Sequence, residues 1–331
     1  TPKPSSAASD VYKRQDTLFS VKYRLNADNK HPVTRLNSYA GLGFAVPSKL
    51  ADVQLRDQTA LFNQQMILDA LGAEPNTFSR ATVMNISAHK ATAKEAARAT
   101  AKHKRHQGPR YGQTFKLRIT ATGLLHAYSP SANVIYSSLL VNGKKAKPLI
   151  NADGTRYVFK LGQHTKGEVV TVSYVTSRPQ AGYDNEFVSL DQAKYVKLAQ
   201  SLKQNRFKLD RKSGVTWLSG HVTGTPQRRL LYVSIPDTAG WHATVDGKPV
   251  KIRSAMHAQS IIPVVKNYRG MIGVPIHVGK NHVVLKYTTP GLTVGALLSA
   301  VGAVIFAFLL IAGEWLRPLR RRKAQRKTDQ S

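Results

Sequence analysis

The chain has 331 residues, which is enough for more than one domain, and it contains no cysteine. The lack of cysteine excludes a disulfide framework and any metal site with thiolate ligands. Lys and Arg number 49 against 18 Asp and Glu, so the formal net charge is +31, and most of it lies between residues 16 and 313. A surface this basic attracts polyanions, of which phospholipid headgroups and phosphate polymers are expected first. No nucleic-acid recognition motif accompanies the charge, so nucleic acid is not a predicted partner.

Residues 1–15 do not read like the start of a protein. There is no initiator Met, and Asp10 to Gln15 (DVYKRQ) can be encoded by the transposon end that is used to prepare sequencing libraries. We therefore expect this segment to be an adapter-derived artefact that takes no part in the fold, the alternative being a polar, disordered terminus. We also expect the chain to be the C-terminal part of a longer protein.

Residues 16–87 are predicted to be a connecting segment with one strand and one helix. The strand is expected at 16–25, an irregular glycine-containing stretch at 37–46, and the helix at 57–71 with Asp57 as N-cap. Residues 88–110 are rich in Ala, Lys, Arg and His and are predicted to be a basic linker or insertion, with a solvated helix as far as His106 as an alternative. The candidates for polyanion binding in this stretch are Lys102, Lys104, Arg105 and Arg110.

From residue 111 onward the pattern predicts β-structure in two modules. The first module is expected at 111–178, with strands at 115–120, 134–141, 156–161 and 169–175 and turns at Asn142-Gly143 and Asp153-Gly154. The second is expected at 179–291. It should hold a helix at 190–202 and strands at 215–222, 229–235, 242–245, 248–252, 260–265 and 282–287.

The two β regions carry a weak internal repeat. VNGKKAKPL followed by LGQHTKGEVVTVSY parallels VDGKPVKI followed by VPIHVGKNHVVLKY, each pairing a hairpin with a closing strand. Coincidence among hairpins is the alternative. We predict a mainly β fold of two β-sandwich-like modules with a few short helices, plus one C-terminal transmembrane α-helix.

No charged residue occurs from Leu292 to Gly313. As a helix rising about 1.5 Å per residue, this stretch is about 33 Å long, enough to cross a hydrocarbon core of about 30 Å. We predict a transmembrane helix at 292–316 and a basic cytoplasmic tail at 317–331, with everything before Leu292 outside a bacterial cell membrane. Lipid headgroup contacts are expected from Arg317, Arg320, Arg321, Arg322 and Lys323.

The sequence contains few motifs of the kind that carry catalysis or metal binding. The histidines form no HxH or HExxH motif, and His103 with His106 lies in a basic run that opposes cation binding, so no metal site is predicted. Asp184 and Glu186 form a close carboxylate pair, for which loop solvation is preferred over acid–base catalysis. Trp241 and Tyr268 are glycan-binding candidates because aromatic faces suit sugar rings, although core packing is the preferred interpretation. We predict no catalytic residue and no cofactor.

Several segments resemble the YfhO-type family of bacterial membrane proteins. TAGWHATVDGKPVKI (Thr238 to Ile252) and GKNHVVLKYTTPG (Gly279 to Gly291), leading into the membrane helix and basic tail, carry most of the resemblance. LFSVKYRL, SYAGLGFAVPSKL and LFNQQMILDALGAE are similar to other family segments. Ala40-Gly41 replaces the family's usual leucine-proline, and Gln64-Gln65 stands where glutamine-asparagine is common. The resemblance covers residues 16 to about 327.

The resemblance implies a multi-span glycosyltransferase of the GT-C type that decorates teichoic acids with sugars from lipid carriers. Its catalytic acidic residues are expected in upstream loops, so this chain would be an accessory extracytoplasmic part. The implied partners are membrane lipid, an anionic cell-envelope polymer, a lipid-linked sugar and the missing upstream transmembrane bundle. Gly295, Ser299 and Ala303 recur every four residues and suit packing against that bundle, or are merely tolerated in a lone anchor. The alternative function is a membrane-anchored polyanion- or glycan-binding module without catalysis.

Overall fold

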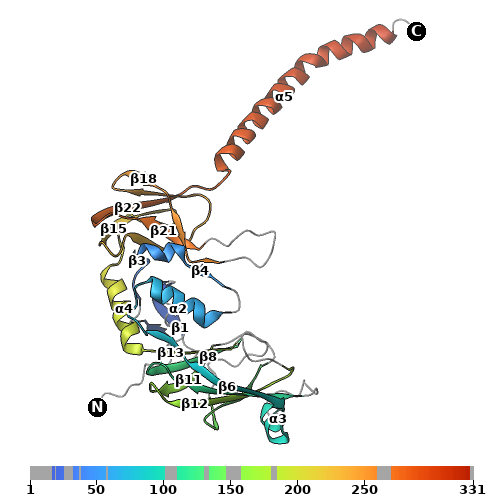
Figure 1. Cartoon of the computed structure of the whole chain (residues 1–331). Helices are drawn as coiled ribbons and strands as arrows, with labels where there is room; N and C mark the ends of the chain where they lie inside the picture. Colours follow the sequence, from blue (N-terminus) through green and yellow to red (C-terminus); the bar gives the residue numbers. More distant parts are fainter. Residues whose placement is uncertain are drawn as a thin grey trace.

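In the computed structural model the chain is mainly β, as the sequence predicts, and its last helix projects away from the strands (Figure 1). The structure describes residues 17–18, 20–25, 33–36, 39–56, 59–100, 110–129, 134–146, 158–179, 185–258 and 270–328, with side chains up to Ala312. Four larger antiparallel sheets stack in pairs and form two β-sandwiches. Two small sheets accompany them, β1 (Tyr23–Leu25) with β2 (Val33–Arg35) and β4 (Gln54–Leu55) with β20 (His257–Ala258).

The first sandwich has sheets with the strand orders β10-β9-β12-β7-β6 and β11-β8-β13-β5. Along β7, Phe115 and Leu117 are buried while Lys116 and Arg118 are exposed, the alternation of a strand with one wet face. Phe115 meets Phe187 of the other sheet with ring centroids 5.0 Å apart, so the sheets share one core. The strands are β5 (Phe78–Arg80), β6 (Thr82–Lys90), β7 (Tyr111–Arg118), β8 (Gly123–Tyr128), β9 (Val134–Val141), β10 (Lys144–Lys145), β11 (Val158–His164), β12 (Val169–Thr176) and β13 (Glu186–Leu190).

The second sandwich repeats this layout with the orders β14-β15-β22-β17-β18 and β19-β21-β16-β3. Val283 and Leu285 of one sheet and Leu231 and Ile272 of the other are fully buried together in its core. The strands are β3 (Gly43–Val46), β14 (Lys208–Leu209), β15 (Trp217–Gly224), β16 (Leu230–Pro236), β17 (Trp241–Val245), β18 (Lys248–Val250), β19 (Arg253–Ala255), β21 (Met271–Pro275) and β22 (Gly279–Tyr287).

Strand β3 makes the second sandwich discontinuous in sequence. It pairs antiparallel with β16, with Val46 opposite Leu230, although every strand of the first sandwich lies between β3 and β14 along the chain. The prediction of an irregular stretch at 37–46 is therefore wrong at its C-terminal end. Position 43 of this strand requires glycine because the backbone of β16 approaches closely there. An added Cβ would lie 2.6 Å from the carbonyl oxygen of Tyr232.

Strand pairing also crosses the segment boundaries that the sequence suggested. β6 begins before residue 88 and pairs with β7 along its length, and β13, which follows residue 178, pairs with β8. The described part of 88–110 completes β6 and then forms α3 (Ala93–Thr100), in which Ala99 is buried, so the helix given as the alternative for this stretch is present over these residues. Residues 101–109 lie outside the described residues.

A third apolar core joins the two sandwiches. It contains residues of α2 (Ala60–Ala70), of the 3-10 helix η2 (Ser48–Asp52) and of α4 (Gln192–Gln204), and α2 lies between the sandwiches in Figure 1. Phe44 of β3 packs on Tyr232 of β16 with ring centroids 5.2 Å apart, and the Tyr232 hydroxyl donates to the carbonyl of Leu18 at 3.0 Å. Val188 adds a buried side chain from the first sandwich. Shared burial of this kind couples the two sandwiches mechanically.

The predicted helices are confirmed, with shifted ends. α2 begins after Thr59, and the predicted cap Asp57 lies outside the described residues. α4 begins after Asp191, whose carboxylate accepts hydrogen bonds from the backbone N–H groups of Ala193 and Lys194. The strand predicted at 16–25 is only partly right, because residues 17–18 are helical and β1 begins at Tyr23.

The turns at Asn142-Gly143 and Asp246-Gly247 have positive φ at both residues, as such hairpin turns require. The strands predicted between 115 and 252 and at 282–287 are present, with ends shifted by a few residues, as β7, β9, β11, β12, β15, β16, β17, β18 and β22. The sequence did not predict β2, β3, β4, β5, β6, β8, β10, β13, β14, β19, β20 and β21. The turn predicted at Asp153-Gly154 and the strand predicted at 260–265 lie outside the described residues.

Candidate functional site

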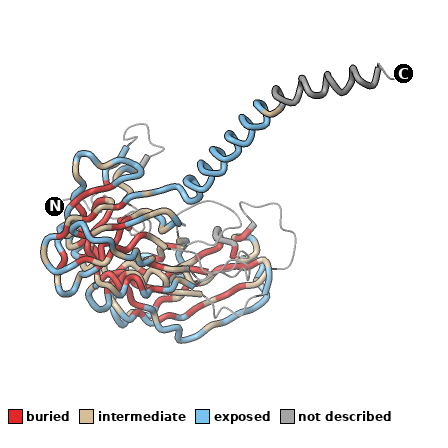
Figure 2. Tube along the Cα trace, turned by 90° about the horizontal axis from the view of Figure 1, so that it is seen from above, coloured by how far each residue is buried: buried red, intermediate tan, exposed pale blue. Residues whose placement is uncertain are grey.

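The C-terminal helix is the feature of the structure that fits a membrane anchor. α5 runs from Leu292 to Thr328, and in the described part of the chain Leu292–Ala312 is the segment long and apolar enough to span a bilayer. None of that span is buried against the sandwiches (Figure 2). Burying one large apolar side chain is worth about 1.5–3 kcal/mol, and Leu297, Phe306 and Ile311 are all exposed. The span therefore needs an apolar surrounding, which a bilayer supplies.

The helix does not end at 316 but continues to Thr328. The predicted basic tail thus begins as a continuation of the membrane helix. The residues expected to contact lipid headgroups lie on this continuation, and their side chains are outside the described residues, so that contact remains a prediction: Arg317, Arg320, Arg321, Arg322 and Lys323.

The junction between the second sandwich and α5 is held by hydrogen bonds. The backbone N–H of Thr288 donates to the carbonyl of Gly240 at 2.9 Å, which ties the start of β17 to the end of β22. Gly240 has φ of 108°, and an added Cβ would lie 2.3 Å from the carbonyl oxygen of Thr288. This position accepts only glycine without rearrangement.

The glycan-binding candidate Trp241 stands at the same junction. Its ring lies against Tyr287, with centroids 5.2 Å apart, and it is half-buried beside the core of the second sandwich. This packing agrees with the preferred interpretation of Trp241 as a core residue, and sugar contact remains a prediction. Tyr268, the other candidate, lies outside the described residues.

Of the polyanion-binding candidates, the structure describes Arg110. It stands directly before β7, half-buried, and its carbonyl accepts the N–H of Ala91 at 2.8 Å. Lys102, Lys104 and Arg105 lie outside the described residues. Other exposed basic side chains lie on the outer face of the sheet β14-β15-β22-β17-β18, the face turned away from the core, among them Lys208, Lys280 and Lys286.

Glu186, one of the close carboxylate pair Asp184 and Glu186, has a structural partner. Its two carboxylate oxygens accept the backbone N–H groups of Leu61 and Phe62, at 2.8 and 3.3 Å, at the first turn of α2. The N-cap residue Thr59 makes no side-chain capping bond there, so Glu186 caps the helix from a distant strand. Burial raises the pKa of Glu186 above its ordinary value, and the two N–H groups offset this only in part. Asp184 lies outside the described residues.

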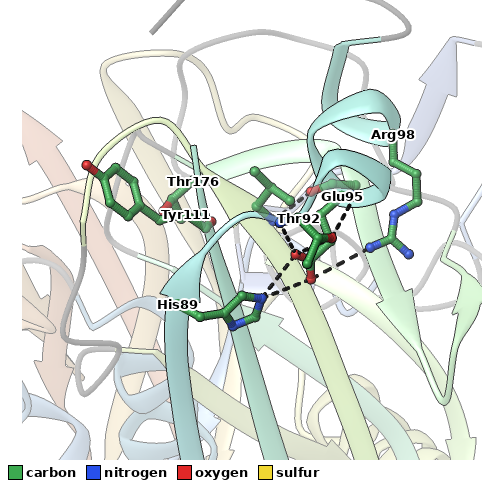
Figure 3. Close-up of polar contacts among 8 residues, drawn as sticks. His89, Thr92, Glu95, Arg98, Tyr111 and Thr176 are labelled. Carbon is green, nitrogen blue, oxygen red and sulfur yellow. Dashed lines mark hydrogen bonds and ion pairs between the residues drawn. The ribbon is translucent and has the colours of Figure 1, made fainter. Parts of the chain in front are cut away.

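The start of α3 explains why an alanine- and lysine-rich stretch folds (Figure 3). Thr92 and Glu95 form a capping box, with the N–H of Thr92 donating to the Glu95 carboxylate at 2.8 Å and the N–H of Glu95 donating to the Thr92 hydroxyl at 3.3 Å. His89 contacts the same carboxylate at 3.0 Å and Arg98 lies 3.9 Å away. Burial opposes ionisation of Glu95, but the hydrogen bonds from Thr92 and His89 outweigh it and hold its pKa below the ordinary value. An added Cβ at Gly112 would lie 2.4 Å from His89 Nε2, so glycine leaves room for this cluster.

A cluster that the sequence did not reveal lies on the outer face of β14-β15-β22. Asp210, His221 and His282 bring their donor atoms within 4.8 Å of one another. The Ser219 hydroxyl donates to the Asp210 carboxylate at 2.5 Å and lies 2.9 Å from His282 Nε2. This hydrogen bond, followed by the two imidazoles, holds the pKa of Asp210 below its ordinary value, so the carboxylate is anionic.

Residues 8–299 match the family described as bacterial membrane protein YfhO. The chain belongs to this family. The match runs through both sandwiches and into the membrane helix, so this YfhO-family chain is a bacterial membrane protein whose apolar C-terminal helix fits anchoring in the bilayer.

Comparison with solved structures adds no functional information for the YfhO-family chain. A crystal structure of a conserved protein of unknown function, PA5104 from Pseudomonas aeruginosa PAO1, is similar at 10% sequence identity. The match covers 61% of this chain and 92% of that chain with a TM-score of 0.15, which supports no argument about fold or function. No curated protein matches the chain.

Sequence reasoning missed the cluster of Asp210, His221 and His282 for a physical reason. His221 and His282 come from neighbouring strands and Asp210 directly follows the edge strand β14, so the three share no local spacing and no motif marks them. The alternation of β22 places His282 on the wet face, but only the pairing register shows that His221 stands opposite it.

Proposed function

We propose that this YfhO-family chain is the extracytoplasmic, polyanion-binding part of a cell-envelope glycosyltransferase. It would hold an anionic acceptor polymer such as teichoic acid at the membrane while catalytic residues elsewhere in the protein transfer a sugar from a lipid carrier. The observation that carries the proposal is the excess of 49 Lys and Arg over 18 Asp and Glu in a β-rich membrane protein with an apolar C-terminal helix.

The position of the exposed basic residues supports this function. Lys208, Lys280 and Lys286 share the outer face of a sheet whose strand β22 leads into α5 within a few residues. Lys286 stands six residues before α5, so a polymer or lipid whose phosphates lie close to the membrane would meet its ammonium group first. Such contacts act over about 8–10 Å at physiological salt, so nearness to the membrane matters.

The proposal also gives α5 partners in the membrane. Gly295, Ser299 and Ala303 recur on one face of the span, and an added Cβ at Gly295 would meet no atom within 4 Å. Small residues at this spacing let helix backbones approach closely. We place the upstream transmembrane bundle of the full protein against this face, with membrane lipid around the remainder.

Binding of a phosphate polymer to the full chain tests the proposal. The chain is held in nanodiscs of uncharged lipid, and binding of fluorescent poly(glycerol phosphate) is measured as salt is raised. We expect saturable binding that weakens steeply with salt, and none for an uncharged polysaccharide of similar length. Absence of binding at low salt, or an affinity that does not change with salt concentration, would contradict the proposal.

Two sets of substitutions locate the binding surface. The first replaces Lys208, Lys280 and Lys286 by Gln, and the second replaces Lys102, Lys104, Arg105 and Arg110 by Gln. A matched control replaces the exposed Lys144, Lys145 and Lys166 of the first sandwich. We expect at least one of the first two sets to weaken binding more than the control, and equal losses in all three would show that binding is not localised.

A second function, an anchored binding module without catalysis, is favoured by one observation. Glu186, the described member of the close carboxylate pair, is engaged in capping α2. Polymer binding is common to both functions, so sugar transfer from a lipid-linked donor by the protein with its upstream spans separates them. Transfer supports the glycosyltransferase, and its absence with binding retained supports the module.

A further inference from the structure

Two histidines face each other across neighbouring strands of the second sandwich. The pairing register sets His221 of β15 opposite His282 of β22, and their ring centroids are 4.8 Å apart. Both point to the outer face, because Val222 and Val283, the next residues along each strand, are buried. Directly opposed residues have Cβ atoms about 4.5–5.5 Å apart, a separation that lets one ion accept a nitrogen from each ring.

A carboxylate completes the group from the edge strand. Asp210 follows β14, and its Oδ1 lies 3.8 Å from His221 Nε2 while its Oδ2 lies 3.6 Å from His282 Nε2. Zinc takes imidazole and carboxylate ligands at about 2.0–2.2 Å, which puts tetrahedral donor atoms about 3.3–3.6 Å apart. The observed spacings are therefore within a small side-chain adjustment of coordination geometry.

Hydrogen bonds hold the carboxylate in place. The backbone N–H of Asp210 donates to the carbonyl of Ser219 at 2.8 Å, and the Ser219 hydroxyl donates back to the carboxylate. Ser213 is bonded to the backbone of Ser219 on the same side. Partners of this kind orient metal ligands and are part of most metal sites. His282 is fixed as well, because its backbone N–H donates to Asp246 at 2.8 Å.

The first sandwich offers an internal comparison. In its corresponding sheet β10-β9-β12-β7-β6, the positions equivalent to His221 and His282 hold Lys116 and Thr171, which also pair directly. The position equivalent to Asp210 holds Ser87, opposite Thr114. The shared strand order therefore does not by itself produce metal-binding side chains at these positions, and the second sandwich has three together.

We infer that Asp210, His221 and His282 bind one divalent transition-metal ion of the zinc type. Two imidazoles with one carboxylate suit such ions and leave coordination positions free. His221 is 61% exposed, so the free positions face solvent and take water or an oxyanion such as phosphate. The ion would fasten the edge strand β14 to β15 and β22. Lys208, Arg211 and Lys212 stand nearby, lowering affinity for the bare cation and favouring an anionic additional ligand.

Metal titration of the full chain in uncharged detergent micelles tests this inference. Co²⁺ serves as a spectroscopic probe, and Zn²⁺ is added in competition with a chromophoric chelator. We expect one ion per chain, with Zn²⁺ displacing Co²⁺. His221→Ala, His282→Gln and Asp210→Asn should each weaken Zn²⁺ binding by tenfold or more, and Ser219→Ala, which removes an orienting partner, by about 10–100-fold.

His242→Ala is the matched control, because His242 lies on the same outer face and bonds Thr288 instead of the cluster. It should leave Zn²⁺ affinity unchanged. Circular dichroism checks that each variant keeps its strands, and the exposed position of His221 makes His221→Ala the variant least able to disturb folding. Unchanged affinity in the His221→Ala/His282→Gln double variant, or the lack of saturable one-to-one binding, would overturn the inference. Polymer binding is measured separately, since neither result depends on the other.

Discussion

The two sandwiches share one strand order in their five-stranded sheets, but their four-stranded sheets are completed by strands from opposite directions along the chain. In each five-stranded sheet a hairpin, β9–β10 or β17–β18, lies beside a long central strand, β12 or β22, followed by β7 or β15 and the edge strand β6 or β14. In the partner sheets β8 and β16 hold equivalent positions. In the first sandwich β8 pairs with β13, which follows it in sequence. In the second sandwich β16 pairs with β3, which precedes it in sequence. The first sandwich is thus enclosed within the second along the chain.

The hairpin turns show how close the correspondence is. Asn142 donates its N–H to the carbonyl of Thr171 and accepts the N–H of Thr171 on its side chain, both at 2.8 Å. Asp246 makes the same two bonds to His282, also at 2.8 Å. The weak repeat seen in the sequence therefore corresponds to a repeated structure. What differs is the outer face, where one sandwich has the His–Asp cluster and leads into the membrane helix.

The largest expected effect comes from weakening the packing of β3, the strand that precedes the first sandwich in sequence but pairs within the second. Phe44 of β3 is fully buried against Tyr232, so Phe44→Ala should lower the free energy of unfolding by about 3–5 kcal/mol. Denaturant unfolding followed by tryptophan fluorescence measures this, since Trp217 and Trp241 lie in the second sandwich. Val215→Ala, at a side chain 93% exposed, is the control and should change it by less than about 0.5 kcal/mol. A loss below about 1 kcal/mol for Phe44→Ala would mean that β3 does not pack into the apolar core that joins the sandwiches.

Alanine in the two turns tests whether they are equivalent. Asn142→Ala and Asp246→Ala each place a Cβ at φ near +50° and remove a side-chain acceptor, at an expected cost of about 2–3 kcal/mol. Asn142→Asp and Asp246→Asn keep the acceptor and should be nearly neutral. The same unfolding experiment compares the four variants. Costs that differ by more than about 1 kcal/mol between the two alanine variants would refute the equivalence.

Removing the cap on α2 tests how the sandwiches are coupled. Glu186→Ala takes away the acceptor for the N–H groups of Leu61 and Phe62 and should cost about 1–2 kcal/mol of stability. Glu186→Gln keeps one acceptor oxygen and should lose less. Hydrogen exchange at the first turn of α2 measures the effect locally, and unchanged protection there in Glu186→Ala would argue against capping.

The smallest expected effect concerns the pH dependence of the α3 cluster. The pKa of Glu95 is lower in the folded protein than in the unfolded chain. The ionised carboxylate therefore adds to the free energy of unfolding above the pKa of the unfolded chain, and this stabilisation is lost as the pH falls through the pKa of the folded state. Glu95→Gln should therefore cost about 1 kcal/mol at pH 7 and progressively less below about pH 4. His89 and Arg98 are the basic side chains that face the carboxylate. A difference between the two proteins that persists unchanged at low pH would contradict the assignment.

The sequence predicts those elements of the fold that are determined by local residue patterns and by turn residues. The alternation in β7, β12 and β22, the Asn-Gly and Asp-Gly turns and the uncharged span of α5 are all local signals, and they give the fold class. The sequence does not predict β3, because this strand is short, contains glycine and is defined by its pairing with the distant strand β16. The sequence offers α3 only as an alternative, because the helix is stabilised by a capping box and by His89 on a neighbouring strand. The sequence does not predict the cluster of Asp210, His221 and His282, because the pairing register of β15 with β22 places His221 opposite His282, and the pattern of a single strand does not encode this register.

The extracytoplasmic placement of both sandwiches is the claim on which the proposed function depends. The chain has no cysteine, so single cysteines introduced at the exposed Lys248 and at Ser331 can be labelled uniquely. A membrane-impermeant maleimide applied to intact bacterial cells should label Lys248→Cys, and it should label Ser331→Cys only after the membrane is permeabilised. The reverse pattern would place the sandwiches in the cytoplasm and contradict the account.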